Sequence, residues 1–323
     1  MRHENSVFHQ LTKQVPWEVF ERSVARHGSD RRVRRLRTRD QFLAVLYGQL
    51  AGAVSLREIA DGLRSHEARL YHAGLRCVSR STLSDANAKR SFEVYADVFA
   101  EMVRLARPGL RRKLREAVRL LDATKMKLPG GSEGWARFSD RFCAAKLHVA
   151  YEPHERLPLR AVVSADNVND ITPARAMPIE PGATYVFDLA YYSYEWWAAL
   201  HARGCRFVTR LKTHTRLAGE TERPVPADGN ILSDRTGRLP ARMGGGRRNP
   251  FVDPVREIVI AIDTGKTLRL VTNDLQTPPQ DIAQLYKQRW EIELFFKWIK
   301  QNLKIRHFLG TSENAVKTQI YIA

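Results

Sequence analysis

The chain has 323 residues, of which 43% are hydrophobic and 27% are charged. This length predicts two or three domains, and the apolar fraction is large enough for a buried core, which excludes global disorder. No apolar run is long enough to cross a membrane, and the start MRHENSVFHQL lacks the apolar region of a secretory signal. Three widely spaced cysteines exclude a disulfide scaffold, so we expect a cytoplasmic protein without a membrane partner.

The net charge is the first positive indication of a partner. Lys and Arg total 53 against 35 Asp and Glu, which gives +18. An excess of this size predicts a polyanionic partner, most often nucleic acid, although a genome that prefers arginine would also produce a basic protein. The distribution favours the first interpretation, because residues 1–115 carry +11 of the total. Within them, a run of arginines suited to phosphate binding includes Arg31, Arg32, Arg34 and Arg35.

Residues 1–115 have the spacing of helices. Apolar residues recur at helical intervals from residue 42 to residue 59, and Ser55 with Glu58 predicts a capped helix over 56–63. A second start near Ser79 and Arg80 predicts a helix over 85–103. Together they are similar to a helix-turn-helix with Arg80 on DNA, but a plain helical bundle with a basic face fits equally well.

The pattern then changes to strands. Pro108–Gly109 and the basic run 111–113 predict a linker. Short apolar runs predict five strands and one helix, and later segments predict a β-rich insertion with one hairpin, followed by a long helix. The strands are expected at 117–121, 142–151, 159–165, 184–187 and 206–212, the first helix at 194–203, the insertion at 213–274, its hairpin around 263–266, and the long helix from 282 to about 303.

Acidic residues stand at two of these strand ends. Asp122 and Asp188 each follow an apolar strand directly, a position where scaffolds hold catalytic groups, although aspartate also begins many turns. On the long helix, Tyr286, Glu293 and Lys300 lie seven residues apart and therefore share one face. Arg289 lies four residues before Glu293 on that face. The alternative is a solvated face with an ordinary Arg–Glu pair.

The spacing Tyr-x2-Arg-x3-Glu-x6-Lys resembles the YREK motif of bacterial cut-and-paste transposases of the insertion-sequence-4 type. LDATKMKLP at 121–129 resembles the strand of this family that holds its first aspartate, and YVFDLAYYSYEWW at 185–197 resembles the segment that holds its second. FVTRLK at 207–212 resembles the strand that follows in the family. The resemblance covers about 116–323. The chain departs from the pattern at Ala123, where serine is usual, at Leu189–Ala190, where Arg-Gly is usual, and at Asn169, where histidine is usual.

The resemblance implies an α/β fold: an RNase H-like mixed five-stranded sheet with helices on both faces and a β-rich insertion, preceded by an all-α N-terminal domain. The implied limits are 1–115 for the helical DNA-binding domain, 116–212 for the first part of the catalytic core, 213–274 for the insertion and 275–323 for the C-terminal helix of the core. Asp122, Asp188 and Glu293 become the catalytic triad that holds two Mg²⁺ ions, with Mn²⁺ as a substitute. Glu291 points elsewhere on the helix.

The remaining site residues are implied as DNA contacts. Arg289 and Lys300 would hold phosphates, Tyr286 would donate to a phosphate oxygen, and Trp290 would stack on a displaced base. For Trp298 we expect core packing instead. Basic residues near strand ends are expected to contact the DNA backbone: Arg210, Lys212, Lys125, Lys146 and His148. For His148, a buried structural role is equally compatible with the sequence.

The implied function is metal-dependent DNA end cleavage and strand transfer of an insertion sequence, performed by a homodimer on paired terminal inverted repeats and target DNA at the nucleoid. An RNase H-like nuclease without joining activity, or a decayed or domesticated copy that only binds DNA, is the alternative. The chain stops at Ala323 within an apolar helical pattern, whereas family members usually continue. We therefore expect a C-terminally truncated reading frame.

Overall fold

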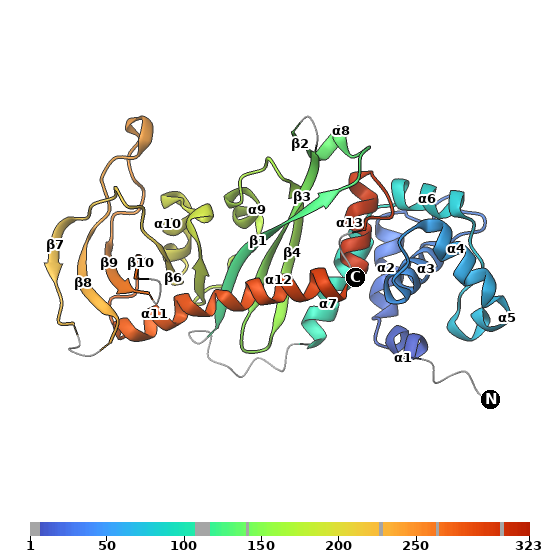
Figure 1. The fold of residues 1–323 in the computed structure, drawn as a ribbon, viewed down its shortest axis with the longest axis horizontal. Coiled ribbons are helices and arrows are strands. Elements are labelled where there is room, and N and C mark those ends of the chain that lie inside the picture. The colour runs from blue at the N-terminus through green and yellow to red at the C-terminus, as the bar shows by residue number, and fades with distance from the viewer. Residues whose placement is uncertain (1–6, 107–116, 140–141, 226–228, 263–264, 304–306) are drawn as a thin grey trace.

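The N-terminal region is entirely helical in the computed structural model, which describes residues 7–106, 117–139, 142–225, 229–262, 265–303 and 307–323. The predicted linker at 108–113 and the turn residues 263–264 lie outside these ranges. Figure 1 shows the N-terminal helices gathered at one end of the molecule. They are α1 (Val7–Lys13), α2 (Trp17–Arg26), α3 (Thr38–Ala51), α4 (Leu56–Ser65), α5 (Glu67–Leu70), α6 (Arg80–Lys89) and α7 (Glu93–Ala106).

Local capping explains two of these helix boundaries. The Ser55 hydroxyl accepts from the Glu58 N–H at 3.2 Å, which confirms the predicted start of α4. The single helix predicted over 85–103 is wrong, because α6 ends at Lys89 and α7 begins at Glu93. The Ser91 hydroxyl accepts from the Glu93 N–H at the break. Because α5 and a short 3₁₀ turn separate α4 from α6, no tight turn joins the two helices that resemble a helix-turn-helix.

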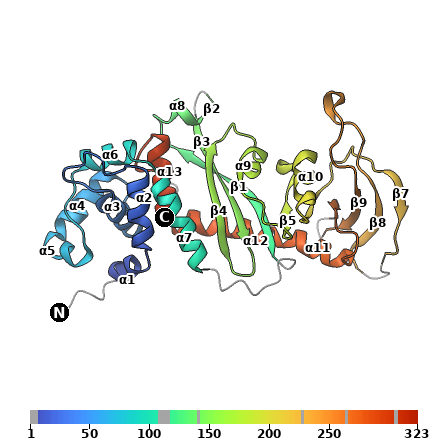
Figure 2. The same cartoon turned by 180° about the vertical axis from the view of Figure 1, so that it is seen from behind.

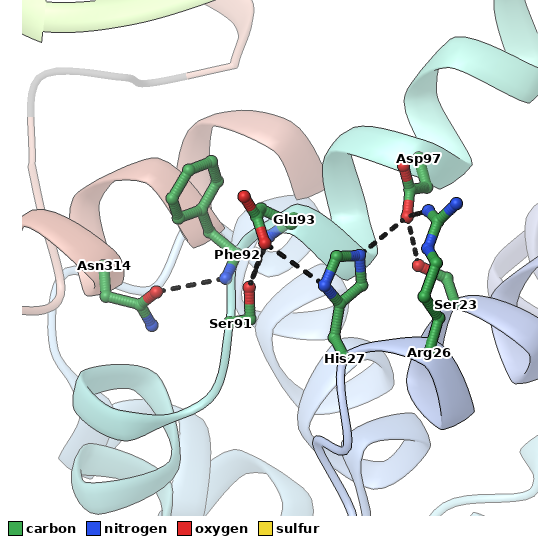
Figure 3. Close-up of polar contacts among 8 residues, drawn as sticks. All are labelled: Ser23, Arg26, His27, Ser91, Phe92, Glu93, Asp97 and Asn314. Atoms are coloured by element: carbon green, nitrogen blue, oxygen red, sulfur yellow. Dashed lines mark hydrogen bonds and ion pairs between the residues drawn. The ribbon is translucent and has the colours of Figure 1, made fainter.

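A polar cluster joins α2 to α7 at the surface of this helical region (Figure 3). The Asp97 carboxylate accepts from Ser23 and Arg26 on α2. His27, at the end of α2, lies 3.1 Å from Asp97 and 3.1 Å from Glu93. The shared carboxylate therefore links the C-terminal end of α2 to α7, and Phe20 of α2 and Tyr95 of α7 belong to the core cluster of the region.

The last helix, α13 (Glu313–Ile322), returns to this N-terminal region. The Asn314 side chain accepts from the Phe92 N–H at 3.0 Å (Figure 3), and it donates to the Asn87 carbonyl at 2.8 Å. Tyr321 stacks on Phe92 with ring centroids 6.0 Å apart. Residues of α13 also belong to the core under the sheet, so this helix contacts both parts of the chain. The domain limits stay predictions.

The second part of the chain is built on one mixed sheet, which has ten strands among the described residues. β1, β3 and β4 pair antiparallel, whereas β1, β5 and β6 pair parallel. The expected mixed sheet is present, but it is larger than five strands because the insertion extends it: β10 pairs with β6 and is followed by β9, β8 and β7. The strands are β1 (Val118–Leu128), β2 (Arg137–Ser139), β3 (Phe142–Glu152), β4 (Leu157–Ala165), β5 (Thr184–Phe187), β6 (Arg206–Arg210), β7 (Ala218–Glu222), β8 (Ile231–Arg238), β9 (Pro254–Ala261) and β10 (Thr267–Thr272).

Strand β1 is longer than predicted. It continues through Asp122 to Leu128, so Asp122 lies within the strand and not after it. Thr124, Met126 and Leu128 are buried on one face while the lysines between them are more exposed. This alternation is the pattern of a strand with one buried face, and it continues well past the apolar run that predicted only 117–121.

Helices cover both faces of the sheet (Figures 1 and 2). α11 (Pro279–Gln288) and α12 (Trp290–Asn302) pack on one face, and α9 (Ile171–Ala176) and α10 (Tyr194–Ala202) pack on the other. The predicted long helix is interrupted at Arg289, where the Arg289 N–H bonds the Tyr286 carbonyl three residues back. Among the described residues no single helix is long and apolar enough to cross a membrane. Taken together, α3 and α4 have the length and apolar composition of a membrane span, but they are bent by 95° relative to each other.

Candidate active site

Three acidic side chains from separate elements line one pocket of about 500 Å³. Leu121 pairs with Phe187 between parallel strands, so Asp122 and Asp188 follow at the same level of the sheet. Glu293 reaches the pocket from α12, which packs on that face through Ile292 and Phe296. Glu291 is not among the lining residues; its charge acts on Tyr151 instead.

Arg289 lies between two of these carboxylates. Its guanidinium donates to Asp122 at 3.0 Å and to Glu293 at 2.6 Å. Burial alone would lower the pKa of Arg289, but Tyr286, Asp122 and Glu293 outweigh burial and raise it. The resemblance implies a phosphate contact for Arg289, whereas the structure places its charge on the acidic residues. The break between α11 and α12 at this residue positions the guanidinium.

Asp122 is the most perturbed of the acidic groups. Burial raises the pKa of its carboxyl to about 6, and the charges of Asp188 and Glu293 add to this. The Ala123 N–H, 2.8 Å away, and Arg289 act in the opposite direction. A carboxylate held in this way gains from a further cation nearby, since a positive charge would offset both its burial and its acidic neighbours.

The donor set suits Mg²⁺, which prefers carboxylate oxygens and keeps several of its waters. Within the described ranges, no three acidic, histidine or cysteine side chains converge closely enough to hold one ion in this arrangement. The guanidinium of Arg289 instead neutralises Asp122 and Glu293. The residues therefore fit the metal in their chemistry, and Arg289 lies between two of the carboxylates.

Further cations border the pocket from α12. Lys300 lines it, as does Lys297, which the sequence reasoning missed. The signal was present, because Lys297 lies four residues after Glu293 and thus on the same side of the helix. Tyr286 lies beside Arg289, with its ring centroid 5.9 Å from the guanidinium carbon, and burial raises the pKa of its hydroxyl.

The tryptophans of α12 are both exposed. Trp290 is 60% exposed and Trp298 is 53% exposed, so the expected core packing of Trp298 is wrong. Leu294 lies between them on the same face and is 49% exposed. The buried side of α12 is formed by its other apolar residues, Ile292, Phe296 and Ile299.

Three residues expected on the DNA backbone lie on the other face of the sheet. Lys125 pairs with Lys146 and Ala123 with His148, and these positions alternate with Asp122 along β1. Lys125 forms an ion pair with Asp166 at 2.9 Å, and Lys146 with Asp170 at 2.7 Å.

His148 has a buried setting. It is 1% exposed and lies 2.8 Å from the Ser164 hydroxyl, and burial lowers its pKa to about 4. The structure thus favours the structural alternative for His148.

The other predicted DNA contacts are exposed. Arg210 ends β6 near Tyr286, and Lys212 lies over the Tyr192 ring at 4.4 Å. In the helical region the predicted arginines are all exposed and lie between α2 and α3 or at the start of α6: Arg31, Arg32, Arg34, Arg35 and Arg80.

Two family models match separate parts of the chain. Residues 113–323 match the family model described as a transposase DDE domain. Residues 3–76 match a domain of unknown function (DUF4372). A structure of piggyBac transposase in a synaptic complex with hairpin DNA aligns with 97% of this chain and 72% of that chain, at 9% identity and a TM-score of 0.41.

Several relatives carry the name transposase. A Sinorhizobium fredii protein named as a transposase, y4zB, is 40% identical over 75% of this chain and 67% of its own length. A Geobacillus stearothermophilus protein, named as a transposase for insertion sequence element IS5377, is 27% identical over 75% of this chain and 64% of its own. The chain thus spans about two thirds of the length of these two relatives. With the family model matching more than half of its residues, the chain belongs to the DDE transposases and is similar to those of the insertion-sequence-4 family.

Proposed function

We propose that this protein catalyses metal-dependent DNA end cleavage and strand transfer of an insertion sequence. The observation that carries the proposal is the meeting of Asp122, Asp188 and Glu293, from three elements, in one pocket bordered by Lys297 and Lys300. Family membership supports it. The order β4-β3-β1-β5-β6, with β1 parallel to β5, supports an RNase H-like core within the larger sheet.

The residues of the pocket divide the work by charge. When bound, two Mg²⁺ ions supply an activated nucleophile and a stabilised leaving oxygen, and Asp122, Asp188 and Glu293 would hold them. Lys297 and Lys300 face the same space and would hold the phosphates beside the scissile bond.

Arg289 contacts two of the carboxylates and therefore limits how closely they approach one another. Tyr286, beside it, would donate from its hydroxyl to a phosphate oxygen.

The partners follow from the charge and the family. Double-stranded DNA, both as paired terminal inverted repeats and as target, would bind to this chain, whose net charge of +18 attracts a polyanion. The exposed arginines between α2 and α3 would contact its phosphates without reading sequence. We propose that the protein acts on DNA as a homodimer, so that two ends are cut and joined together.

The test uses charge-removing substitutions of similar size. Asp122→Asn, Asp188→Asn and Glu293→Gln are expected to abolish nicking of a plasmid that carries the gene with its flanking DNA in Mg²⁺, because each removes a ligand. DNA binding should persist. Glu291→Gln is the matched control, since Glu291 lies two residues from Glu293 but outside the pocket, and it should nick normally.

The outcomes separate this proposal from its alternatives. A Glu293→Gln protein that folds and nicks at the wild-type rate would contradict the assigned role. Nicking without joined product, when a DNA end with a 3′-hydroxyl is supplied, would indicate a nuclease. Binding without nicking by the wild-type chain would indicate a copy that only binds DNA. Unfolding of Glu293→Gln, followed by circular dichroism, would favour a structural Arg289–Glu293 pair.

A further inference from the structure

A second hollow, of about 630 Å³, lies between the start of α10 and the connection from β8 to β9. Three segments meet in it: the α9–α10 region, the chain that follows β6, and the β8–β9 connection. We call this the arm pocket. Its charged side chains, apart from one histidine, are Arg175, Glu195, Lys212, Arg216, Arg242 and Arg247.

The charges of the arm pocket are unbalanced. Five cations face a single carboxylate, Glu195, which two of them already share: Arg175 at 3.3 Å and Arg247 at 3.7 Å. For Lys212, Arg216 and Arg242, the described part of the chain provides no acidic ion-pair partner. A concave site lined in this way attracts anions, because neighbouring cations add their potentials.

The floor of the arm pocket is ordered. The Tyr192 hydroxyl lies 2.9 Å from the Tyr194 hydroxyl and 3.3 Å from that of Thr215. Lys212 lies over the Tyr192 ring at 4.4 Å. These contacts hold the chain that follows β6 against the start of α10, so the cations project from a fixed surface.

The β8–β9 connection supplies the other wall. Gly245 and Gly246 adopt positive φ angles of 73° and 74°, which allow the chain to turn back at the tip. The Met243 N–H then bonds the Arg247 carbonyl at 2.7 Å, and Arg242 pairs with Arg248 through the backbone. The turn therefore places Arg242 and Arg247 on one closed loop, which Figure 1 shows extending beyond the strands in orange.

The arm pocket begins beside the active site. Asp188 is followed by a single 3₁₀ turn, Leu189–Tyr191, and Tyr192 is already part of the arm pocket. Asp188 lines the acidic pocket and Tyr192 lines the arm pocket, so the short segment at the carboxyl end of β5 connects the two sites. A DNA strand that leaves the acidic pocket over this edge would meet the cations of the arm pocket next.

We propose that the arm pocket binds the phosphate backbone of DNA beside the cleavage site, with Arg242 and Arg247 as its principal contacts. The inference rests on the proposed function for the identity of the anion. It adds a contact surface from the insertion and from the chain after β6, separate from the cations of α12.

The test is a DNA-binding titration of the full chain at several salt concentrations. A fluorescein-labelled 30-base-pair duplex of arbitrary sequence is followed by fluorescence anisotropy. Each lost phosphate contact should reduce the slope of log K against log salt by about 0.9. The Arg242→Ala/Arg247→Ala variant should thus lose about 1.8 in slope and on the order of 10- to 100-fold in affinity at 0.1 M salt.

The matched control is Arg203→Ala/Lys266→Ala. It removes the same charge from two exposed residues. Arg203 directly follows the C-terminal end of α10, and Lys266 lies in the turn between β9 and β10. We expect its slope and affinity to remain near wild type. Equal losses in both variants would show a general effect of net charge and overturn the proposal, as would a wild-type slope in the arm variant.

Two further measurements identify the anion and separate the two proposals. Calorimetry with inorganic phosphate tests a small ligand: saturable phosphate binding that the arm variant loses, with unchanged DNA affinity, would overturn the assignment to DNA. If the arm variant binds DNA normally while Asp122→Asn abolishes nicking, the arm pocket proposal fails and the proposed function stands. If the wild-type chain binds no duplex, both proposals fall.

Discussion

Replacing Asp122 with asparagine is expected to stabilise the folded protein at neutral pH while it removes a proposed metal ligand. Burial raises the pKa of Asp122 from 3.8 to about 6, so the folded state holds this proton more tightly than the unfolded state. The free energy of unfolding therefore falls as the pH rises from 3.8 to 6 and stays lower above it. The gap between the two pKa values corresponds to about 3 kcal/mol.

The assay is urea unfolding of the two proteins at pH 7.5 and pH 5, in EDTA. From these pKa values, the advantage of Asp122→Asn should shrink by about 1.4 kcal/mol between pH 7.5 and pH 5, because the wild-type carboxyl regains its proton in the folded state. The attraction between Arg289 and the ionised Asp122 carboxyl already lowers this pKa, so the expected difference includes it.

The matched control is Asp274→Asn, which should show the opposite sign. Burial would raise the pKa of Asp274, but the hydrogen bonds from Thr277, Gln276 and Arg206 outweigh it and lower the pKa. The ionised form of Asp274 thus stabilises the fold at neutral pH, so the Asp274→Asn variant should have a lower free energy of unfolding than the wild type at pH 7.5. An Asp122→Asn protein whose advantage is the same at both pH values would refute the reasoning.

Three further predictions concern other parts of the chain. Arg289→Ala leaves the carboxylates of the acidic pocket without their cation and should cost about 1–3 kcal/mol in urea unfolding at pH 7.5, less at pH 5; an equal cost at both would contradict this. Asn314→Ala leaves the Phe92 N–H without its acceptor and should also cost about 1–3 kcal/mol, whereas the exposed control Asn302→Ala should change stability by less than about 0.5 kcal/mol. Arg34→Ala/Arg35→Ala should reduce the salt slope of DNA binding by about 1.8, and an unchanged slope would place the phosphate contacts elsewhere.

Local signals in the sequence predicted much of the site. The seven-residue spacing on the last long helical segment placed Glu293 and Lys300 on one face, and both line the pocket. The same periodicity missed the break at Arg289, since no glycine or proline marks it, and the Arg289 contacts with Asp122 and Glu293 are made only in the folded chain.

Features that depend on strand pairing between distant parts of the chain could not be predicted from local sequence signals. The strand that holds Asp122 was predicted too short, because the alternation of lysines with buried side chains is weaker than an apolar run. The insertion was expected as a separate β-rich part, whereas β10 joins the edge of β6 and extends the sheet. The face of Lys125 and His148 follows from strand register, which composition does not specify.

The contact between Asn314 and Phe92 has a consequence for the order in which the protein matures on the ribosome. The two residues are 222 positions apart, and α13 completes the packing of α6 and α7. At about 5–20 residues per second, synthesis of the intervening chain takes roughly 10–45 s. During this interval α6 and α7 lack this packing partner, so their contacts are completed only after the strands and helices of the acidic pocket have been made.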